Sequence, residues 1–305
     1  MKITQLLYLP VWFLKAKIFG KKNPLQSVIF ITDQCNLRCK HCNIVNAENP
    51  VSKSFEEIKE ELKYCYQSGS RFVDFEGGEP LLWKDHDKNI NDLITLAKEI
   101  GFFSTTVTTN AQLSFHDCLA DSIWVSMDGL GDFHDSVRGK GSFERLEKNM
   151  AESNHKELSV NMVINTLNYE NVEDAIRYVS EKKYIKSISL NFHTPYPGIE
   201  DLFLPWEKRE EVIELIIKMK RNGFPIMNSV SGLKLMKNNQ FKKVCWVTNF
   251  IMTDGTRLPE CAGKSYDICD QCGLCMAGEM RSVMSFKPDT LWAGMKLRLA
   301  SGFSK

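Results

Sequence analysis

Between residues 27 and 222, strand-like apolar runs alternate with stretches that have helical periodicity. The strand-like runs are rich in β-branched and aromatic residues; they cover 27–34, 71–77, 102–110, 122–129, 158–165 and 187–193. The helical stretches cover 55–69, 88–100, 142–154, 170–182 and 206–222. Such alternation predicts a parallel sheet with right-handed crossovers. We therefore expect an α/β fold, a partial (β/α)6 TIM-like barrel, with its chemistry at the C-terminal ends of the strands.

From about residue 240 this alternation stops and cysteines become frequent. The run "CWVTNFIMTDGTRLPEC" predicts a hairpin that turns at Asp254-Gly255. These changes predict three parts: an N-terminal segment (1–26), a barrel (27–239), and a small cysteine-rich auxiliary domain with the C-terminal tail (240–305).

The N-terminal segment has an apolar run, Leu6 to Leu14, interrupted by Pro10 and followed by four lysines. It is too short to span a bilayer, and the order of charge and apolar run is not that of a signal peptide. Residues 1–22 suit a basic amphipathic segment in a membrane interface. They equally suit a helix packed across an open part of the fold.

Composition narrows the class of protein. The 305 residues include 39 Lys and Arg against 38 Asp and Glu, a net charge of +1, so nothing favours nucleic acid as a partner. Ten cysteines are too few for a secreted disulfide scaffold, and they cluster. Clustered cysteines indicate metal ligands in a reducing compartment, so we expect a cytoplasmic protein. The N-terminal segment adds the possibility that this protein is peripheral at the inner face of the membrane.

The first cysteine cluster is "CNLRCKHC", in the loop after the first predicted strand. Structural zinc sites and ordinary iron–sulfur clusters both need four ligands, whereas Cys35, Cys39 and Cys42 supply three. Three thiolates can hold three corners of a 4Fe–4S cube and leave one iron open. The pattern CxxxCxxC, with His41 before the last cysteine, resembles the signature of the radical S-adenosylmethionine (SAM) superfamily. Zinc, or a chance spacing, is the alternative.

The second motif is "EGGEP", at the end of the second predicted strand. Glycines allow close backbone approach, and proline fixes the exit of the chain. The motif resembles the superfamily's site for the methionine amino group. By that resemblance Gly77, Gly78, Glu79 and Pro80 bind the cofactor, with Glu79 accepting from the ammonium group.

The third motif is "VSMDGLGDFHDSVRGKGSF". Ser126 and Asp128 alternate with apolar residues, so both should face one side of a strand end. The stretch resembles the pattern S-x-D-G…H-D-x-x-R-G of relatives that carry extra clusters. That resemblance assigns Ser126 and Asp128 to the cofactor pocket and pairs Arg138 with the methionine carboxylate.

Further polar residues stand at predicted strand ends. Asn110 and Asn161 are candidates for contact with the cofactor, or are simply strand-end asparagines. We expect His134 to be structural, and His193 is a candidate for facing the substrate.

Five more cysteines lie in the C-terminal part: Cys245, Cys261, Cys269, Cys272 and Cys275. They resemble the SPASM or twitch type of auxiliary domain, which adds a second 4Fe–4S cluster, although the spacing departs from that pattern. Five thiols exceed the four corners of one cube, and the sequence does not indicate which is spare. A zinc knuckle is the alternative.

The resemblance implies reductive cleavage of SAM to a 5′-deoxyadenosyl radical, which acts on an unactivated carbon. It also implies a reductant such as flavodoxin or ferredoxin. The substrate is a small molecule, a lipid or a peptide. The apolar, basic N-terminus resembles that of the radical enzymes that build adenosylhopane-type lipids, which favours a membrane lipid or isoprenoid. A peptide maturase is the alternative, followed by the molybdopterin-precursor enzyme and a non-catalytic iron–sulfur or zinc protein.

Overall fold

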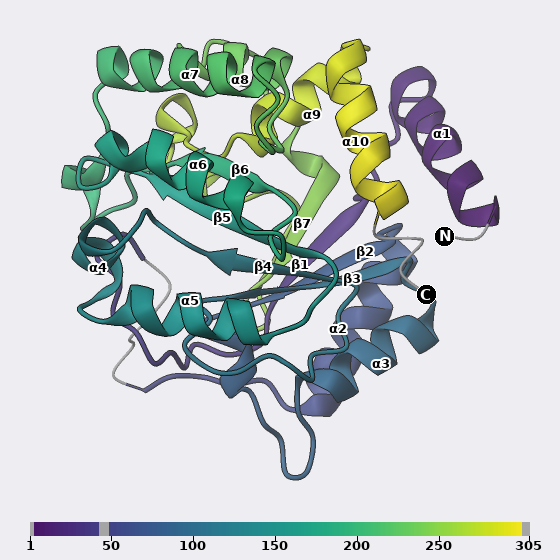
Figure 1. Ribbon diagram of the computed structural model, residues 1–305. Helices are drawn as coiled ribbons and strands as arrows, with labels where there is room; N and C mark the ends of the chain where they lie inside the picture. Colours follow the sequence, from purple (N-terminus) through teal and green to yellow (C-terminus); the bar gives the residue numbers. More distant parts are fainter. Residues whose placement is uncertain (1–2, 43–48, 301–305) are drawn as a thin grey trace.

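The computed structural model describes residues 3–42 and 49–300 (Figure 1). Its central feature is a sheet with the strand order β6-β5-β4-β3-β2-β1-β7-β8. The strands are β1 (Gln26–Phe30), β2 (Phe72–Glu76), β3 (Ser104–Thr109), β4 (Ser122–Ser126), β5 (Leu158–Ile164), β6 (Ile188–Phe192), β7 (Thr248–Ile251) and β8 (Arg257–Leu258). Strands β1 to β6 pair in parallel with their neighbours, as the alternating pattern predicts.

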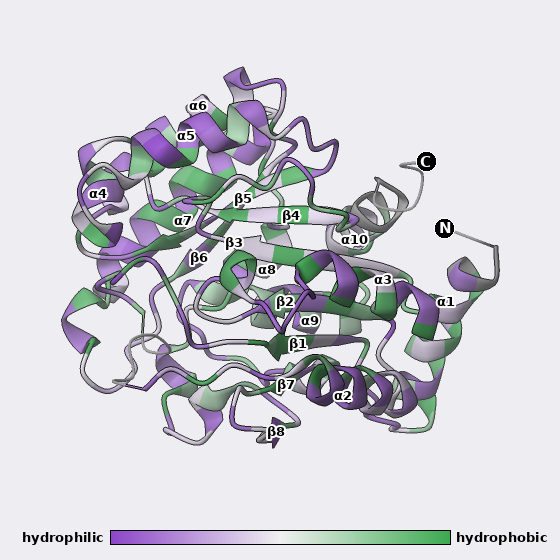
Figure 2. Ribbon diagram, turned by 90° about the horizontal axis from the view of Figure 1, so that it is seen from below, coloured by the Kyte–Doolittle hydropathy of each residue, from purple (hydrophilic) through white to green (hydrophobic). Residues whose placement is uncertain are grey.

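Five helices occupy the stretches with helical periodicity: α2 (Phe55–Ser68), α3 (Ile90–Ile100), α5 (Ser142–Glu152), α6 (Val172–Glu181) and α7 (Trp206–Arg221). Helix α2 illustrates how the sequence sets their ends. Ser54 and Glu57 form a reciprocal capping box, and Gly69 ends the helix in the left-handed region at φ 118°. Figure 2 shows polar residues along the outer side of α2 and apolar residues on the strands, so the helices cover the sheet with their apolar faces.

Strand β7, the first strand of the cysteine-rich segment, joins that segment to the barrel. Strand β7 pairs in parallel with β1, and β7 and β8 form the antiparallel hairpin that the sequence predicts. Gly255 takes a positive φ of 88° in the turn. The pairing of β7 with β1 was not predicted, because nothing local in a four-residue strand indicates its partner.

Further helices have no counterpart in the sequence prediction: α4 (Asp132–Arg138), α8 (Val230–Met236), α9 (Met276–Met284) and α10 (Pro288–Ala300). Helix α1 (Ile3–Ile18) lies at the end of the sheet where the strands begin. Its Trp12 Nε1 donates to Asn23 O at 2.9 Å and its Tyr8 hydroxyl donates to Gly69 O at 2.6 Å. One face of α1 is therefore packed onto the fold, as one of the two readings of the N-terminal segment expects.

The loop that carries the last three cysteines docks on the end of β6. Phe192 N donates to Gly273 O at 2.9 Å, and Cys275 N donates to Asn191 Oδ1 at 2.9 Å. A Cβ atom on Gly273 would lie 1.8 Å from Phe192 O. Only glycine allows the two backbones to approach this closely.

Replacing Gly273 with alanine should lower the free energy of unfolding by about 1–3 kcal/mol, because a backbone carbonyl cannot move aside as a flexible side chain can. Urea unfolding would measure the change. Gly294→Ala is the matched control, since a Cβ there meets nothing within 4 Å and alanine favours a helix. Equal stability of both variants would contradict the docking described here.

Glu279 of α9 predicts how stability varies with pH. Its carboxylate accepts from Ser229 N at 2.8 Å, and burial raises its pKa to about 7. The folded state therefore holds this proton at pH values where the unfolded state has lost it, so stability falls as pH rises. Relative to Glu279→Gln, the protein should lose ~2 kcal/mol of unfolding free energy between about pH 5.5 and about pH 7.5. Parallel pH profiles for the two proteins would contradict this assignment.

Candidate active site

A cavity of about 600 Å³ opens at the C-terminal ends of the barrel strands, where the fold predicts the chemistry. Its volume lies in the range of small-molecule sites. Its lining brings together residues from most of the motifs found in the sequence: Cys35, Cys39, His41, Cys42, Gly77, Gly78, Asn110, Ser126, Arg138, Asn161 and Cys261.

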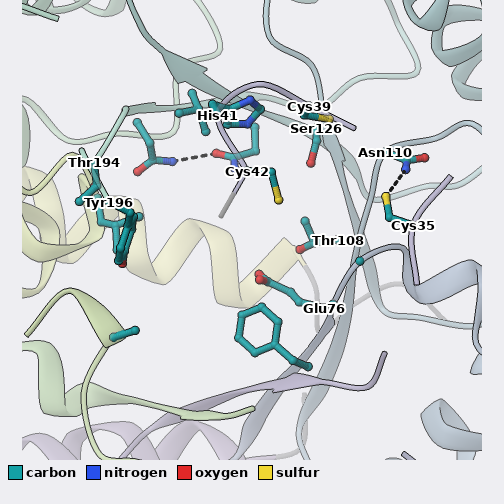
Figure 3. A pocket seen from close by; sticks show the side chains of 18 of the residues that line it. Cys35, Cys39, His41, Cys42, Glu76, Thr108, Asn110, Ser126, Thr194 and Tyr196 are labelled. Carbon is teal, nitrogen blue, oxygen red and sulfur yellow. Dashed lines mark hydrogen bonds between the residues drawn. The ribbon is translucent and has the colours of Figure 1, made fainter. Parts of the chain in front are cut away.

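The three cysteines of the first cluster share this cavity (Figure 3). Two of the thiols face hydrogen-bond donors. Asn110 Nδ2 lies 3.6 Å from Cys35 Sγ, and Arg138 Nη1 lies 3.8 Å from Cys39 Sγ. Burial raises the pKa of Cys39 to about 11, and the Arg138 guanidinium opposes that rise. These donors favour the thiolate form that a metal or cluster requires.

His41 lines the same cavity and is almost buried. Burial lowers its pKa to about 4, so the ring is neutral at pH 7 although Nε2 lies 3.5 Å from Asp128 Oδ2. Its buried Nδ1 has no hydrogen-bond partner among the described residues. A buried ring nitrogen without a partner is uncommon in a folded protein, and it leaves one polar atom here for a bound group.

The two glycines of "EGGEP" bring their backbone against the chain that leads to Cys35. Gly78 N donates to Thr32 O at 2.6 Å, and Glu79 N donates to Gln34 O at 2.7 Å. A Cβ on Gly78 would lie 2.1 Å from Gln34 O. The glycines thus set the distance between two motifs, in addition to lining the cavity.

Glu79 and Pro80, which the motif assigns to the cofactor, do not line the cavity. The Glu79 carboxylate is fully buried and accepts from Thr109 Oγ1 at 2.7 Å and from Asn110 N at 2.8 Å. These contacts hold Asn110 in position beside Cys35. That Glu79 accepts from an ammonium group stays a prediction.

Asp128 also departs from the prediction that it lines the pocket with Ser126. Ser126 lines the cavity, but Asp128 is completely buried behind it. Its carboxylate accepts from Arg138 Nε at 2.7 Å and from Val163 N at 2.8 Å, and these two donors turn it away from the cavity. Burial acts to raise the pKa of Asp128, but Arg138 and His41 outweigh it and hold that pKa below its usual value.

The sequence suggests a structural position for His134 and a position facing the substrate for His193. His134 is buried, and its Nδ1 accepts from Asp128 N at 3.1 Å, which is a structural contact. His193 lines the cavity, with Nε2 2.8 Å from Ile199 O.

Sequence reasoning missed Glu76, the first residue of "EGGEP", which points into the cavity beside Thr108 (Figure 3). Burial raises its pKa to about 7, and it is hydrogen-bonded to Asp74. The spacing of Asp74 and Glu76, two apart on one strand, could have revealed the pair.

Three of the five C-terminal cysteines line a second cavity of about 260 Å³. Cys245, Cys261 and Cys269 line it, and Cys261 also lines the first cavity. A hydrogen bond from Cys245 lowers the pKa of Cys261 to about 6. The buried Cys272 interacts electrostatically with Cys261. Four thiols therefore gather here.

Cys275 stands apart from the other four. It is 1% exposed, lies in the main hydrophobic core, and interacts electrostatically with Cys272 alone among the cysteines.

Arg209 is a completely buried cation next to these thiols. It stacks on Phe192 and Trp206, and its Nη2 donates to Cys272 O at 2.9 Å. Its Nε and Nη1 have no hydrogen-bond partner among the described residues. The ionisable groups that interact with it are the thiols of Cys275 and Cys272, whose pKa values burial raises and Arg209 lowers. Burying an unpaired charge is strongly unfavourable, so the arginine favours thiolate nearby.

The donor set of both cavities fits iron–sulfur clusters, which cysteine thiolates hold. In the described part of the chain, no three His, Cys, Asp or Glu side chains converge closely enough to hold a single metal ion.

Comparison with protein families identifies a match to the model described as the Radical SAM superfamily over residues 29–181. Among curated proteins, the chain is 29% identical to Fe-coproporphyrin III synthase of Methanosarcina barkeri over 72% of its length and 61% of that protein. The chain is also 31% identical to GTP 3′,8-cyclase of Clostridium botulinum, in a match that covers 52% of this chain and 53% of that protein. The chain thus spans less than two thirds of either relative.

Among solved structures, similar chains include Streptococcus suis SuiB bound to S-adenosylmethionine, with a TM-score of 0.65, 19% identity, and coverage of 92% of this chain and 68% of that one. Native anSMEcpe with bound AdoMet and a peptide aligns with a TM-score of 0.61 and 17% identity over 90% of this chain and 83% of that one. At these identities the likeness establishes the TIM-like barrel fold.

The buried ion pair behind the cavity leads to a prediction about stability. Asp128→Asn should lower the free energy of unfolding by about 3 kcal/mol, because it leaves the Arg138 guanidinium buried without its counter-charge. Urea unfolding at neutral pH would measure this loss. Glu214→Gln breaks an exposed ion pair with Lys237 and should leave the unfolding midpoint almost unchanged. Similar losses in both variants would refute the structural role given to Asp128.

Proposed function

The chain belongs to the radical SAM superfamily, and we propose that it is an enzyme that directs radical chemistry at an unactivated carbon of a polar substrate. The observation that carries this proposal is the cavity that brings Cys35, Cys39 and Cys42 beside Gly77 and Gly78. When bound, a 4Fe–4S cluster and SAM together supply a 5′-deoxyadenosyl radical, which abstracts hydrogen from a C–H bond.

In this proposal the three thiolates hold the first cluster. Asn110 and Arg138 then act on the sulfur atoms of Cys35 and Cys39, which tunes the reduction potential of a cluster. Ser126 and Asn161 offer a hydroxyl and an amide to the cofactor from the cavity wall. Arg138 keeps Nε on Asp128 and Nη1 near Cys39 Sγ, which leaves Nη2 for a carboxylate.

Four thiols suit a second 4Fe–4S cluster, and we assign them as Cys245, Cys261, Cys269 and Cys272. Three of them line one cavity, and Cys272 interacts electrostatically with Cys261, which supports this choice. The burial of Cys275 in the main core makes it the spare thiol. The buried Arg209 supports anionic sulfur at Cys272. Since Cys261 lines both cavities, a second cluster would lie at the wall of the first cavity. An electron carrier such as flavodoxin or ferredoxin would supply the electron that cleaves SAM.

The lining of the cavity contains apolar side chains, such as Phe250 and Met252, together with polar ones that could orient a polar substrate. Glu76, Asn191, Thr194 and Tyr196 are among its polar lining residues. Figure 3 shows Thr194 and Tyr196 on the far side of Cys42 from Cys35. One relative, GTP 3′,8-cyclase, is named for a polar nucleotide, and anSMEcpe was crystallised with a peptide. We therefore favour a peptide or another polar molecule. The lipid suggested by the N-terminal segment loses its main support, because α1 lies at the opposite end of the strands from this cavity.

Iron content and SAM cleavage test both clusters together. Protein reconstituted without oxygen should bind about eight irons and form 5′-deoxyadenosine with dithionite. Cys39→Ala should retain about four irons and lose SAM cleavage, because only the first cluster contacts the cofactor. Cys269→Ala should also retain about four irons, but keep SAM cleavage.

Cys118→Ala is the matched control, since Cys118 lines neither cavity, and it should retain both clusters. Full SAM cleavage by Cys39→Ala would reject the enzymatic proposal. Four irons with one zinc in the unmodified protein would reject the second cluster and leave the first.

A further inference from the structure

Exposed large hydrophobic side chains concentrate at one end of the molecule. Eight of the fourteen in the described part of the chain belong to α1, to the residue after it, or to the region 286–295. They are Leu7, Val11, Leu14, Ile18, Phe19, Phe286, Trp292 and Met295. The two regions are adjacent, because Phe13 and Phe286 stack edge to face at 5.0 Å, and Figure 1 draws α10 beside α1. We call these eight residues the terminal apolar surface.

Helix α1 has two apolar faces with different surroundings. Trp12 and Ala16 are buried against Val244 and Val247. On the opposite face, Leu7, Val11, Leu14 and Ile18 recur at helical spacing and are between 47% and 66% exposed. A helix that only closed the end of the barrel would need polar residues on its outer face. The outer stripe therefore indicates a further contact.

Positive charge surrounds this stripe. Lys15, Lys17, Lys21 and Lys22 fall within eight residues, and no acidic residue precedes Asp33. Lys17 Nζ donates to Met284 O at 2.7 Å and so ties α1 to α9. No ion pair involves Lys15, Lys21 or Lys22 in the described chain, and all three are exposed. The surface is thus apolar at its centre and basic at its margin.

We propose that the terminal apolar surface docks on the headgroup region of an anionic lipid bilayer. Apolar side chains on one face with lysines at the border suit the boundary between acyl chains and headgroups, where the long lysine side chains reach the phosphates. Each lysine near an anionic membrane contributes roughly fivefold to the partition coefficient. A second copy of this chain fits less well, because it would bring the same lysines against one another.

The docking is peripheral. In the described residues no helix has the length and apolar character to cross a bilayer. Helix α1 has 16 residues, about 24 Å of helix, and its inner face is already packed on the protein, so it would lie flat on the surface.

The position of this surface has a consequence for the enzyme. Tyr8 and Trp12 hold α1 beside Gly69 and Asn23, which precede β2 and β1, whereas the catalytic cavity opens at the far ends of the strands. A docked molecule would keep its cavity directed away from the bilayer. The surface therefore determines where the enzyme works and does not deliver a lipid to the cavity, so this inference is independent of the proposed reaction.

Co-sedimentation of the full chain with vesicles tests the proposal. The protein should sediment with vesicles that contain about a third phosphatidylglycerol, and much less with phosphatidylcholine alone or at high salt. Leu14→Glu with Ile18→Glu should reduce the partition coefficient at least tenfold. Lys21→Gln with Lys22→Gln should also reduce it about tenfold or more, on anionic vesicles only.

Leu119→Glu is the matched control, because Leu119 is 55% exposed outside the terminal apolar surface, and it should bind as the unmodified protein does. Thermal unfolding and SAM cleavage of each variant would show that the fold persists. Failure of the unmodified protein to bind anionic vesicles would overturn the proposal. So would unchanged binding of the double glutamate variant, or a dimer in solution that the same variant dissociates.

Discussion

The site depends on the contact between the glycine turn after β2 and the chain that leaves β1. Two backbone hydrogen bonds, from Gly78 to Thr32 and from Glu79 to Gln34, hold these segments together. They can form because Gly77 and Gly78 lack Cβ atoms that would lie within 2.3 Å of backbone oxygens. The cysteine loop begins directly after this contact, so its position is set by the backbone of the neighbouring strand. Two motifs that are forty residues apart in the sequence thereby become one site.

A buried arginine lies near cysteine thiols in both halves of the site. Around the first cavity, Asp128 compensates Arg138, and Arg138 Nη1 lies 3.8 Å from Cys39 Sγ. Around the second, Arg209 has no carboxylate partner in the described chain and lies by Cys272 and Cys275. Since a buried cation requires a nearby anion, the two arginines mark where anionic sulfur is favourable. In both places burial raises the pKa of the neighbouring thiols, Cys39 and Cys272, and the arginine opposes that rise.

The two ends of the barrel carry different features. The C-terminal ends of the strands carry the cysteines, the glycine turn and the polar lining of the cavity. The N-terminal ends carry α1, which closes the fold with one face and exposes apolar side chains on the other. The strands between them keep the proposed membrane contact and the proposed reaction space apart.

The sequence by itself determined the order of the elements, because hydrophobic periodicity of 2 or 3.6 residues is a local property. It also singled out the candidate residues for the chemistry, since the spacing of Cys35, Cys39 and Cys42 and the letters "EGGEP" can be recognised without any structure. Only the tertiary structure decided that β7 pairs with β1 and that Cys275 stands apart from the other four C-terminal thiols. It also decided which carboxylates face the cavity: Glu76 lines it, whereas Glu79 and Asp128 are buried and do not. The physical reason is that pairing, burial and side-chain direction depend on contacts between residues distant in the chain. No pattern within one segment specifies which hydrogen-bond donors another segment will present to a buried carboxylate.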